Sequence, residues 1–141
     1  SISSIARLTD MGIEPYMIAS SLVGIMAQRL MRKICPYCKK AYTPSVLDQD
    51  LLHGEADKLY KGKGCHACNQ TGYKGRIAIH ELLPVDRAIK RMVSEKRQIE
   101  DIYDYANKEL HFQTLLESAE QLVLQGITTT EELLKLTYYV N

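Results

Sequence analysis

The spacing of apolar residues predicts a pair of short helices at the start of the chain. Residues 3–11 repeat apolar side chains at helical spacing, and Gly12 suits the left-handed position just past a helix end. Pro15 fits the first turn of a second helix, because a proline there loses no hydrogen bond. This second helix is expected to reach about Ser21.

Two later stretches favour strands. In residues 23–32 a strand would place Ile25, Ala27 and Arg29 on one face and Met26, Gln28 and Leu30 on the other, although a helical continuation is also compatible with so short an apolar run. Residues 76–83 favour a second strand. We expect the two strands to pair in antiparallel fashion, with the segment between them as an excursion.

The segment between the strands carries weaker signals. Residues 44–64 contain four leucines and predict one or two short helices. Lys61-Gly62-Lys63-Gly64 is interpreted as a turn, and so is Thr71-Gly72-Tyr73-Lys74-Gly75, because glycine readily adopts positive φ.

From Asp86 onward the pattern is helical. Three apolar stripes follow one another, and the third ends at Gly126. Thr128 or Thr129 is expected to cap a last helix, with Glu131 or Glu132 completing a capping box. Each stripe is typical of a packed core.

Composition limits the possible classes of protein. The chain has 141 residues, of which 45% are hydrophobic and 25% charged, as in ordinary globular proteins. It has no apolar run of about 18 residues and no signal peptide at its start. Its first residue is Ser and not Met, which indicates a piece of a longer protein. Because the sequence shows no export signal, a reducing, cytosolic setting is the default expectation.

Charge is unevenly distributed along the chain. Residues 29–76 hold ten Lys or Arg and four acidic residues, whereas residues 77–141 hold seven Lys or Arg and eleven acidic residues. The middle of the chain is therefore basic and the tail acidic. Part of the basic charge would offset thiolates bound to a metal ion.

The four cysteines are the strongest chemical signal. They form two Cys-x-x-Cys pairs, Cys35 with Cys38 and Cys65 with Cys68, separated by residues 39–64. Each pair can supply two soft ligands from a tight turn, and two pairs complete a tetrahedral zinc site. Such a site has no open position for water, so the Zn²⁺ ion is expected to be structural. No catalytic or nucleotide-binding residue is assigned.

The cysteines also have alternative interpretations. Cys35-Pro36-Tyr37-Cys38 looks locally like a glutaredoxin active site, which needs its first cysteine at a helix N-terminus. The preceding helices and the second cysteine pair do not suit that fold. A pair of disulfides conflicts with the reducing setting. His66 and His80 are possible substitute ligands, but both are better explained without a metal.

Several motifs occur in order along almost the whole chain. They are Asp10-Met11-Gly12-Ile13-Glu14-Pro15-Tyr16, Ala27-Gln28-Arg29-Leu30, the two cysteine pairs, Gly72-Tyr73-x-Gly75-Arg76, Ile79-His80-Glu81-Leu82-Leu83 and Gly126-Ile127-Thr128-Thr129. Together they resemble the secretion ATPases of bacterial type II secretion and type IV pilus assembly, the family of general secretory pathway protein E and pilus assembly protein B.

The resemblance implies a place for this chain in a larger machine. It looks like the C-terminal portion of a hexameric ATPase on the cytoplasmic side of the inner membrane, which drives polymerisation of pilins or pseudopilins. The implied partners are neighbouring subunits of the homohexamer, an inner-membrane platform protein and a cytoplasmic adaptor. ATP and Mg²⁺ would belong to the motor domain of the parent protein.

The expected fold is mixed α/β and mostly helical, with a short antiparallel strand pair, an inserted four-cysteine zinc module and a C-terminal helical bundle. Residues 1–34 would end a RecA-like motor domain, residues 35–75 would form the zinc module, and residues 76–141 would add a strand and a helical subdomain.

Activity is not expected from the chain alone. It contains no Gly-x-x-x-x-Gly-Lys-Ser/Thr loop, so no cradle for nucleotide phosphates is predicted. Arg29 and Arg32 either approach a neighbour's nucleotide or lie on an exposed strand edge. A nucleic-acid-binding zinc ribbon is the alternative function, with Tyr37, Tyr42, Tyr60 and Tyr73 stacking on bases, although no direct nucleic-acid contact is expected from the family resemblance.

Overall fold

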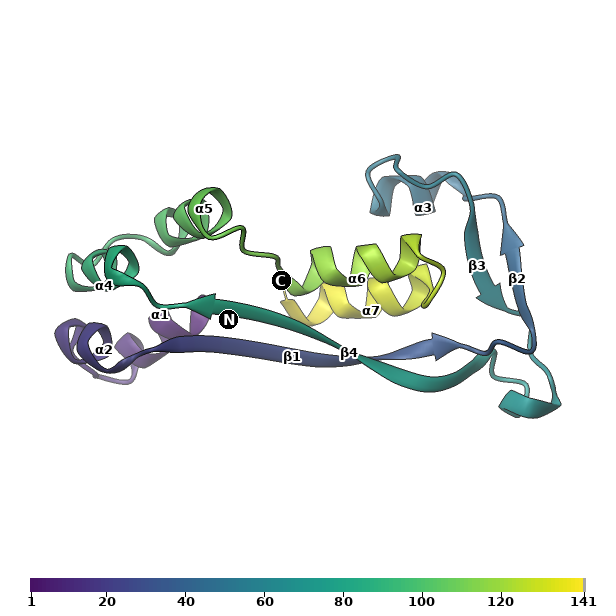
Figure 1. Cartoon of the computed structure of the whole chain (residues 1–141), viewed down its shortest axis with the longest axis horizontal. Coiled ribbons are helices and arrows are strands. Elements are labelled where there is room, and N and C mark those ends of the chain that lie inside the picture. The colour runs from purple at the N-terminus through teal and green to yellow at the C-terminus, as the bar shows by residue number, and fades with distance from the viewer. Residues whose placement is uncertain (141) are drawn as a thin grey trace. The chain divides into compact units, whose positions relative to one another are not determined.

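The computed structural model describes residues 1–140, with side chains through residue 139, and it is mixed α/β (Figure 1). The described residues form two compact units. Unit 1 comprises residues 1–28 and 80–114, and unit 2 comprises residues 29–79 and 115–141, of which 141 is not described. Strands β1 (Gly24–Ile34) and β4 (Tyr73–Pro84) pair with each other, and each passes from one unit into the other.

Unit 1 is built from four helices: α1 (Ser3–Asp10), α2 (Pro15–Ser21), α4 (Arg87–Ser94) and α5 (Ile99–Glu109). Helix α2 packs on α4. The two strands enter this unit antiparallel, and the Val85 amide donates to the Val23 carbonyl over 2.9 Å. Asp86 caps α4 by accepting a hydrogen bond from the Ile89 amide.

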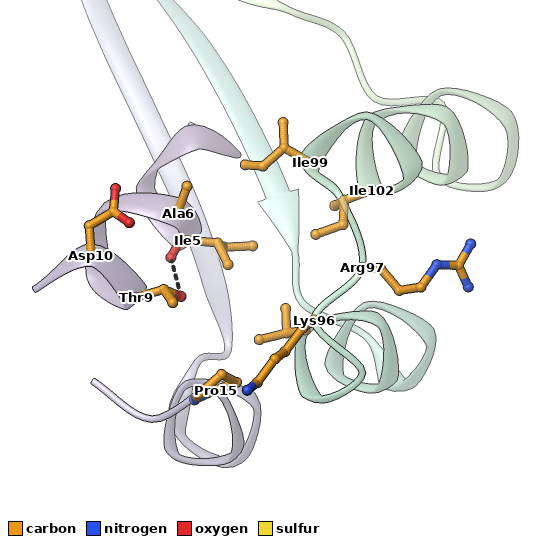
Figure 2. Close-up of a pocket in the computed structure, with 10 residues that line it drawn as sticks. Ile5, Ala6, Thr9, Asp10, Pro15, Lys96, Arg97, Ile99 and Ile102 are labelled. Carbon is orange, nitrogen blue, oxygen red and sulfur yellow. Dashed lines mark hydrogen bonds between the residues drawn. The ribbon is translucent and has the colours of Figure 1, made fainter. Parts of the chain in front are cut away.

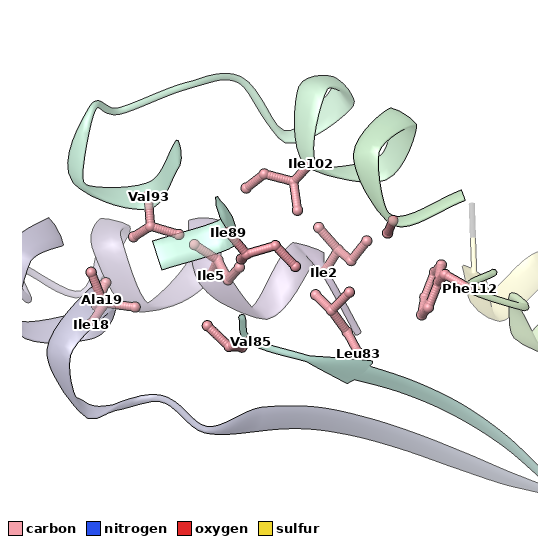
Figure 3. Close-up of a cluster of buried hydrophobic side chains, with 11 residues drawn as sticks. Ile2, Ile5, Ile18, Ala19, Leu83, Val85, Ile89, Val93, Ile102 and Phe112 are labelled. Atoms are coloured by element: carbon pink, nitrogen blue, oxygen red, sulfur yellow. The ribbon is translucent and has the colours of Figure 1, made fainter. Parts of the chain in front are cut away.

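A continuous cluster of buried apolar side chains forms the core of unit 1. Figure 3 shows these side chains pointing into a common interior between the helices and the end of β4. The cluster consists of Ile2, Ile5, Ile18, Ala19, Leu83, Val85, Ile89, Val93, Ile102, Ala106 and Phe112.

Unit 2 adds a second antiparallel sheet. Strand β2 (Lys39–Tyr42) pairs with β3 (Leu59–Gly62), in a register that sets Lys39 opposite Gly62. Between these strands lies α3 (Val46–Leu51), and after β3 comes a short 3₁₀ helix, η1 (His66–Cys68). Helices α6 (Leu115–Leu124) and α7 (Thr130–Val140) pack together as a pair, in which α6 contacts β3 and α7 contacts α3 (Figure 1).

The predicted helices and strands are largely confirmed, including the two opening helices and the pairing of the two long strands. The turn predicted over residues 61–64 is wrong at its start, because Lys61 and Gly62 belong to β3. The β2–β3 hairpin was not predicted. Its strands lack the alternation of a half-buried strand, since the first three residues of β2 are all exposed.

The predicted cap of the last helix is confirmed in part. Thr129 is the cap, because its Oγ1 accepts a hydrogen bond from the Glu132 amide over 3.2 Å. Thr128 serves another purpose and donates its hydroxyl to the Arg32 carbonyl over 2.7 Å. The Glu132 carboxylate accepts from the backbone and side chain of Arg32.

Across residues 1–140, none of the helices is both long and apolar enough to cross a membrane. The division into a motor end, a zinc module and a helical subdomain at residues 34/35 and 75/76 stays a prediction.

Candidate metal centre

The four cysteines come from two separate stretches and converge in unit 2. Cys35 directly follows β1, and Cys38 ends the turn that leads into β2. Cys65 precedes η1, and Cys68 is its last residue. All four sulfur atoms lie within 4.8 Å of one another, so the group could hold a metal ion. The sequence prediction that these residues come together is confirmed.

The distances between sulfur atoms suit a tetrahedron. The Sγ atoms of Cys35 and Cys65 are 3.8 Å apart, those of Cys38 and Cys68 are 3.9 Å apart, and those of Cys65 and Cys68 are 3.7 Å apart. A tetrahedral site with metal–sulfur bonds of about 2.3 Å has edges of about 3.8 Å. All four cysteines are free, and Cys35 and Cys68 are buried.

Backbone amides surround the sulfur atoms. The amides of Cys65 and Gly72 donate to Cys68 Sγ over 3.3 and 3.2 Å, and the Gly64 amide donates to Cys38 Sγ over 3.3 Å. Gly64 and Gly72 have φ values of 101° and 82°, which glycine adopts without a steric penalty. These amides stabilise negative charge on sulfur, as a thiolate ligand requires.

The sulfur atoms differ in acidity. Burial alone would raise the pKa of Cys68, but the amide hydrogen bonds from Cys65 and Gly72 outweigh it and lower the pKa to about 6. Burial raises the pKa of Cys38 to about 11, together with contacts to the other thiols, and the Gly64 amide offsets this only in part. One thiol is therefore ready to ionise, whereas another needs a cation nearby.

The β2–β3 hairpin packs closely against the turn that follows Cys68, where Gly62 of β3 meets Gly72. A Cβ atom on Gly62 would lie 2.1 Å from the Gly72 carbonyl oxygen, and one on Gly72 would lie 2.6 Å from the Gly62 carbonyl oxygen. The Cys35 amide also donates to the Gly72 carbonyl over 2.9 Å. Gly72 therefore connects the first cysteine, the hairpin and the second cysteine turn.

Comparison with known proteins adds the family. The sequence profile described as "Type II/IV secretion system protein" matches residues 1–135. The chain belongs to the type II/IV secretion system protein family. The family resemblance inferred from the sequence motifs is thereby confirmed.

Individual relatives agree with this family. The chain is 42% identical to the type IV pilus assembly ATPase PilB of Thermus thermophilus, over 95% of this chain and 16% of that protein. It is 38% identical to the type II secretion system protein HxcR of Pseudomonas aeruginosa, over 96% of this chain and 26% of that protein. It is 36% identical to the type II secretion system ATPase E of Vibrio cholerae, over 96% of this chain and 27% of that protein. The chain thus spans about a quarter or less of each relative's length.

In this member of the secretion family, the histidines weighed as substitute ligands are not part of the sulfur cluster. His66 and His80 are both exposed. The group that could hold a metal consists of cysteines alone among the described residues.

The glutaredoxin-like alternative lacks its helix. Residues 36–38 form a turn that leads into strand β2. Cys35 therefore does not lie at a helix N-terminus, where the helix dipole would lower its pKa. The nearby second pair, with Cys65 Sγ 3.8 Å from Cys35 Sγ, also leaves the first pair no separate role.

The tyrosines proposed to stack on bases are mostly covered by this chain's own cations. Lys39 Nζ lies 4.7 Å from the centre of the Tyr60 ring, and Lys61 Nζ lies 4.9 Å from that of Tyr42. The Arg32 guanidinium lies 3.9 Å from the centre of the Tyr73 ring. Tyr37 is 73% exposed. One ring face of Tyr42, Tyr60 and Tyr73 is therefore occupied by a cation of this chain, whereas Tyr37 stays open to solvent.

Sequence reasoning missed a polar network beside the cluster. Arg32 donates its Nε to Glu132 Oε1 over 2.9 Å, and its amide donates to Glu132 Oε2 over 2.9 Å, whereas its approach to a neighbour's nucleotide stays a prediction. Tyr73 Oη lies 2.7 Å from Thr129 Oγ1. Burial would raise the pKa of Glu132, but the hydrogen bonds and charge of Arg32 lower it below its usual range. No sequence signal links positions so far apart.

Arg29 also has a contact within unit 2. Its guanidinium carbon lies 5.7 Å from the centre of the Tyr139 ring. At this distance the arginine is placed to make a cation–π contact with α7.

Unit 1 contains a small apolar pocket of about 300 Å³. Its lining includes the core residues Ile5 and Ile102, and Figure 2 shows Lys96 extending toward Pro15 while Arg97 points away from α1. Arg97 Nε donates to Asp101 Oδ2 over 3.1 Å. The pocket contains no cluster of metal-binding side chains among the described residues.

Proposed function

We propose that this chain is the C-terminal, zinc-binding portion of a hexameric ATPase that powers pilin or pseudopilin polymerisation for type II secretion or type IV pili. The family match supports a role in a secretion or pilus-assembly machine, and two relatives are named as ATPases. The chain covers only a minor share of each relative, so ATP hydrolysis is assigned to the remainder of the parent protein.

The observation that carries the proposal is the convergence of four sulfur atoms within 4.8 Å of one another, with three of the distances between them at 3.7, 3.8 and 3.9 Å, close to the edge of a tetrahedral site. Cys35, Cys38, Cys65 and Cys68 would hold one Zn²⁺ ion, which supplies a structural cross-link between the two stretches. Zinc fits this donor set because it favours four thiolates without an open position for water. The surrounding amides would orient the sulfur atoms and offset their charge.

The position of the metal centre favours a coupling role. The first cysteine pair follows β1 and the second precedes β4, so the centre joins the ends of the two long strands. Gly72 and Arg32 extend these links to the hairpin and to α7. A force applied to the cysteine cluster would therefore be transmitted to strands β1 and β4 and to the helix pair α6–α7 through short, directional contacts.

The proposed partners are neighbouring subunits of the hexamer, an inner-membrane platform protein and a cytoplasmic adaptor. The proposed location is the cytoplasmic face of the inner membrane. ATP and Mg²⁺ would bind to the motor domain of the parent protein, because this chain has no phosphate-binding loop.

The experiment compares Cys65→Ser with the wild type in the full-length parent protein. We expect zinc content to fall from about one ion per subunit to near zero, with loss of pilus assembly or secretion and a smaller loss of basal ATP hydrolysis. Ala67→Ser is the matched control, because it introduces the same side chain at an exposed position of the same turn. Normal secretion by a zinc-free Cys65→Ser protein would contradict the coupling role.

A further inference from the structure

We propose that the groove between α3 and α7 is a docking site for a basic amphipathic helix of a partner protein. The groove has a volume of about 590 Å³ and lies wholly within unit 2. The inference rests on the coupling role proposed above and deepens it, because it assigns that role a surface and a chemical class of partner.

Three of the residues that line the groove are leucines, and two of these are left open to solvent by the fold. Leu47 of α3 is 79% exposed and Leu134 of α7 is 47% exposed, and both line the groove. Leu51 lines it as well. Exposed leucines gathered in one concave site favour an apolar partner, whereas single exposed leucines are common and need no partner.

The apolar surface continues beyond the groove along α7, where Tyr138 is 78% exposed. Leu134 and Tyr138 lie four residues apart on α7 and therefore share a helical face. Such an elongated strip suits a helix that presents apolar residues at successive turns better than it suits a compact small molecule.

Acidic side chains surround this strip. Asp48, Asp50 and Glu131 line the groove, and no Lys, Arg or His is among its lining residues. Lys135 Nζ is 4.0 Å from Glu131 Oε1, which neutralises part of that charge. The remaining negative charge complements a partner whose apolar face is flanked by Lys or Arg, and it opposes anionic lipids and nucleic acids.

The groove is held in place before any partner arrives. Ser45 and Asp48 form a capping box at the start of α3. The side chains of Tyr42 and Thr130 lie close to the Asp48 carboxylate, and Thr130 is the first residue of α7. A preformed groove binds at a lower entropic cost than one that must order itself.

A second copy of this chain does not offer the required helix. Its strongly basic helix is α4, which carries Arg87, Lys90 and Arg91. The apolar residues Ile89 and Val93 of that helix are buried in the core of unit 1. A second copy of these 141 residues is therefore not the occupant that the groove favours, and the charge complementarity is assigned to a partner protein.

The test uses the purified chain and a fluorescently labelled synthetic peptide. The peptide is a helix of leucine and lysine with leucines spaced by three and four residues, and a comparison peptide has glutamate in place of every lysine. Fluorescence anisotropy should show saturable binding of the basic peptide, at least about tenfold tighter than that of the acidic peptide and weaker at high salt.

Two groove variants should weaken binding of the basic peptide. Leu47→Ser should weaken it about tenfold or more, and Asp50→Lys about threefold to tenfold. Both positions are exposed, so folding should be retained, which thermal unfolding checks. The matched controls are Leu82→Ser and Glu100→Lys, at exposed positions of unit 1, and these should leave binding unchanged.

Three results would overturn the inference: equal binding of both peptides, equal effects of groove and control variants, or no saturable binding. Self-association that Leu47→Ser abolishes, seen by analytical ultracentrifugation, would also overturn it and identify a second copy as the occupant. Zinc content is measured on every variant. Failed peptide binding with zinc retained overturns only the docking site, whereas a wild-type chain without zinc overturns the proposed metal centre whatever the peptide does.

Discussion

Both units bury apolar side chains, including Ile89 in unit 1 and Leu59 and Leu133 in unit 2, but unit 2 in addition gathers four cysteines and buries Thr128, Thr129 and Glu132. Burial of apolar surface is non-directional. Metal coordination and hydrogen bonds to buried polar groups depend on distances and angles. The comparison teaches that unit 2 should depend more sharply than unit 1 on single polar contacts and on the proposed metal ion.

The largest difference is expected on metal removal. Treating the purified chain with a strong zinc chelator should speed amide hydrogen exchange in residues 29–79 by about 100-fold or more. Residues 1–22 and 85–106 should keep their protection, because the core of unit 1 contains no cysteine. Hydrogen–deuterium exchange with mass spectrometry measures both at once, and equal loss in the two units would contradict the comparison.

Truncating a buried apolar side chain of unit 1 tests the prediction that this unit is stabilised without the metal ion. Ile89 is fully buried in unit 1, so Ile89→Ala should lower the free energy of unfolding of that unit by about 2–5 kcal/mol, through lost burial and a cavity. Zinc content should remain at the wild-type level. Arg91→Ala, on an exposed position of the same helix, should change stability by less than about 0.5 kcal/mol. Denaturant unfolding and metal analysis provide the two readouts.

Backbone packing near the metal centre can be tested with a pair of glycines. Gly72→Ala places a Cβ 2.6 Å from the Gly62 carbonyl oxygen at a φ of 82°, and should cost about 3 kcal/mol and weaken zinc retention. Gly75→Ala has a similar φ of 83° but meets only Lys33 Cδ at 3.8 Å, so it should cost about 1 kcal/mol. If the two variants lost equal stability in thermal unfolding, close packing of the hairpin would not be the cause.

The smallest expected effect is the loss of stability when the Glu132 carboxylate is protonated at low pH. Its pKa is lowered in the folded chain below an ordinary value of 4.5, so its stabilisation is present above that value and is lost as pH falls through the folded pKa. Glu132→Gln should lower stability near pH 7 by about 1 kcal/mol and flatten the loss of stability below pH 4.5. A pH series of urea unfolding curves measures this, and an unchanged slope in the variant would contradict the assignment. Glu100→Gln, at an exposed position, is the control.

How far the sequence predicts this structure differs between features. The cysteine cluster was predictable because ligand spacing within each pair is local and the metal preference of thiolates is strong. The two long strands were predictable as short apolar runs between turns, although the first of these runs was equally compatible with a helix. The β2–β3 hairpin was not, because Lys39–Tyr42 is exposed and its pairing with Leu59–Gly62 leaves no periodic apolar signal.

Contacts between distant residues were beyond sequence reasoning. The pairing of Arg32 with Glu132 joins positions 100 apart in the chain, and the groove depends on α3 meeting α7. Arg32 by itself suggested a phosphate contact, because a guanidinium suits phosphate and carboxylate equally well. Only the fold decides which anion it meets.

The most direct test of the central claim is zinc K-edge X-ray absorption on the purified chain. We expect one zinc ion per chain with four sulfur ligands at about 2.3 Å, and complete loss of this signal in Cys65→Ser. Nitrogen or oxygen ligands in the first coordination shell, or a folded wild-type chain that purifies without zinc, would contradict the account.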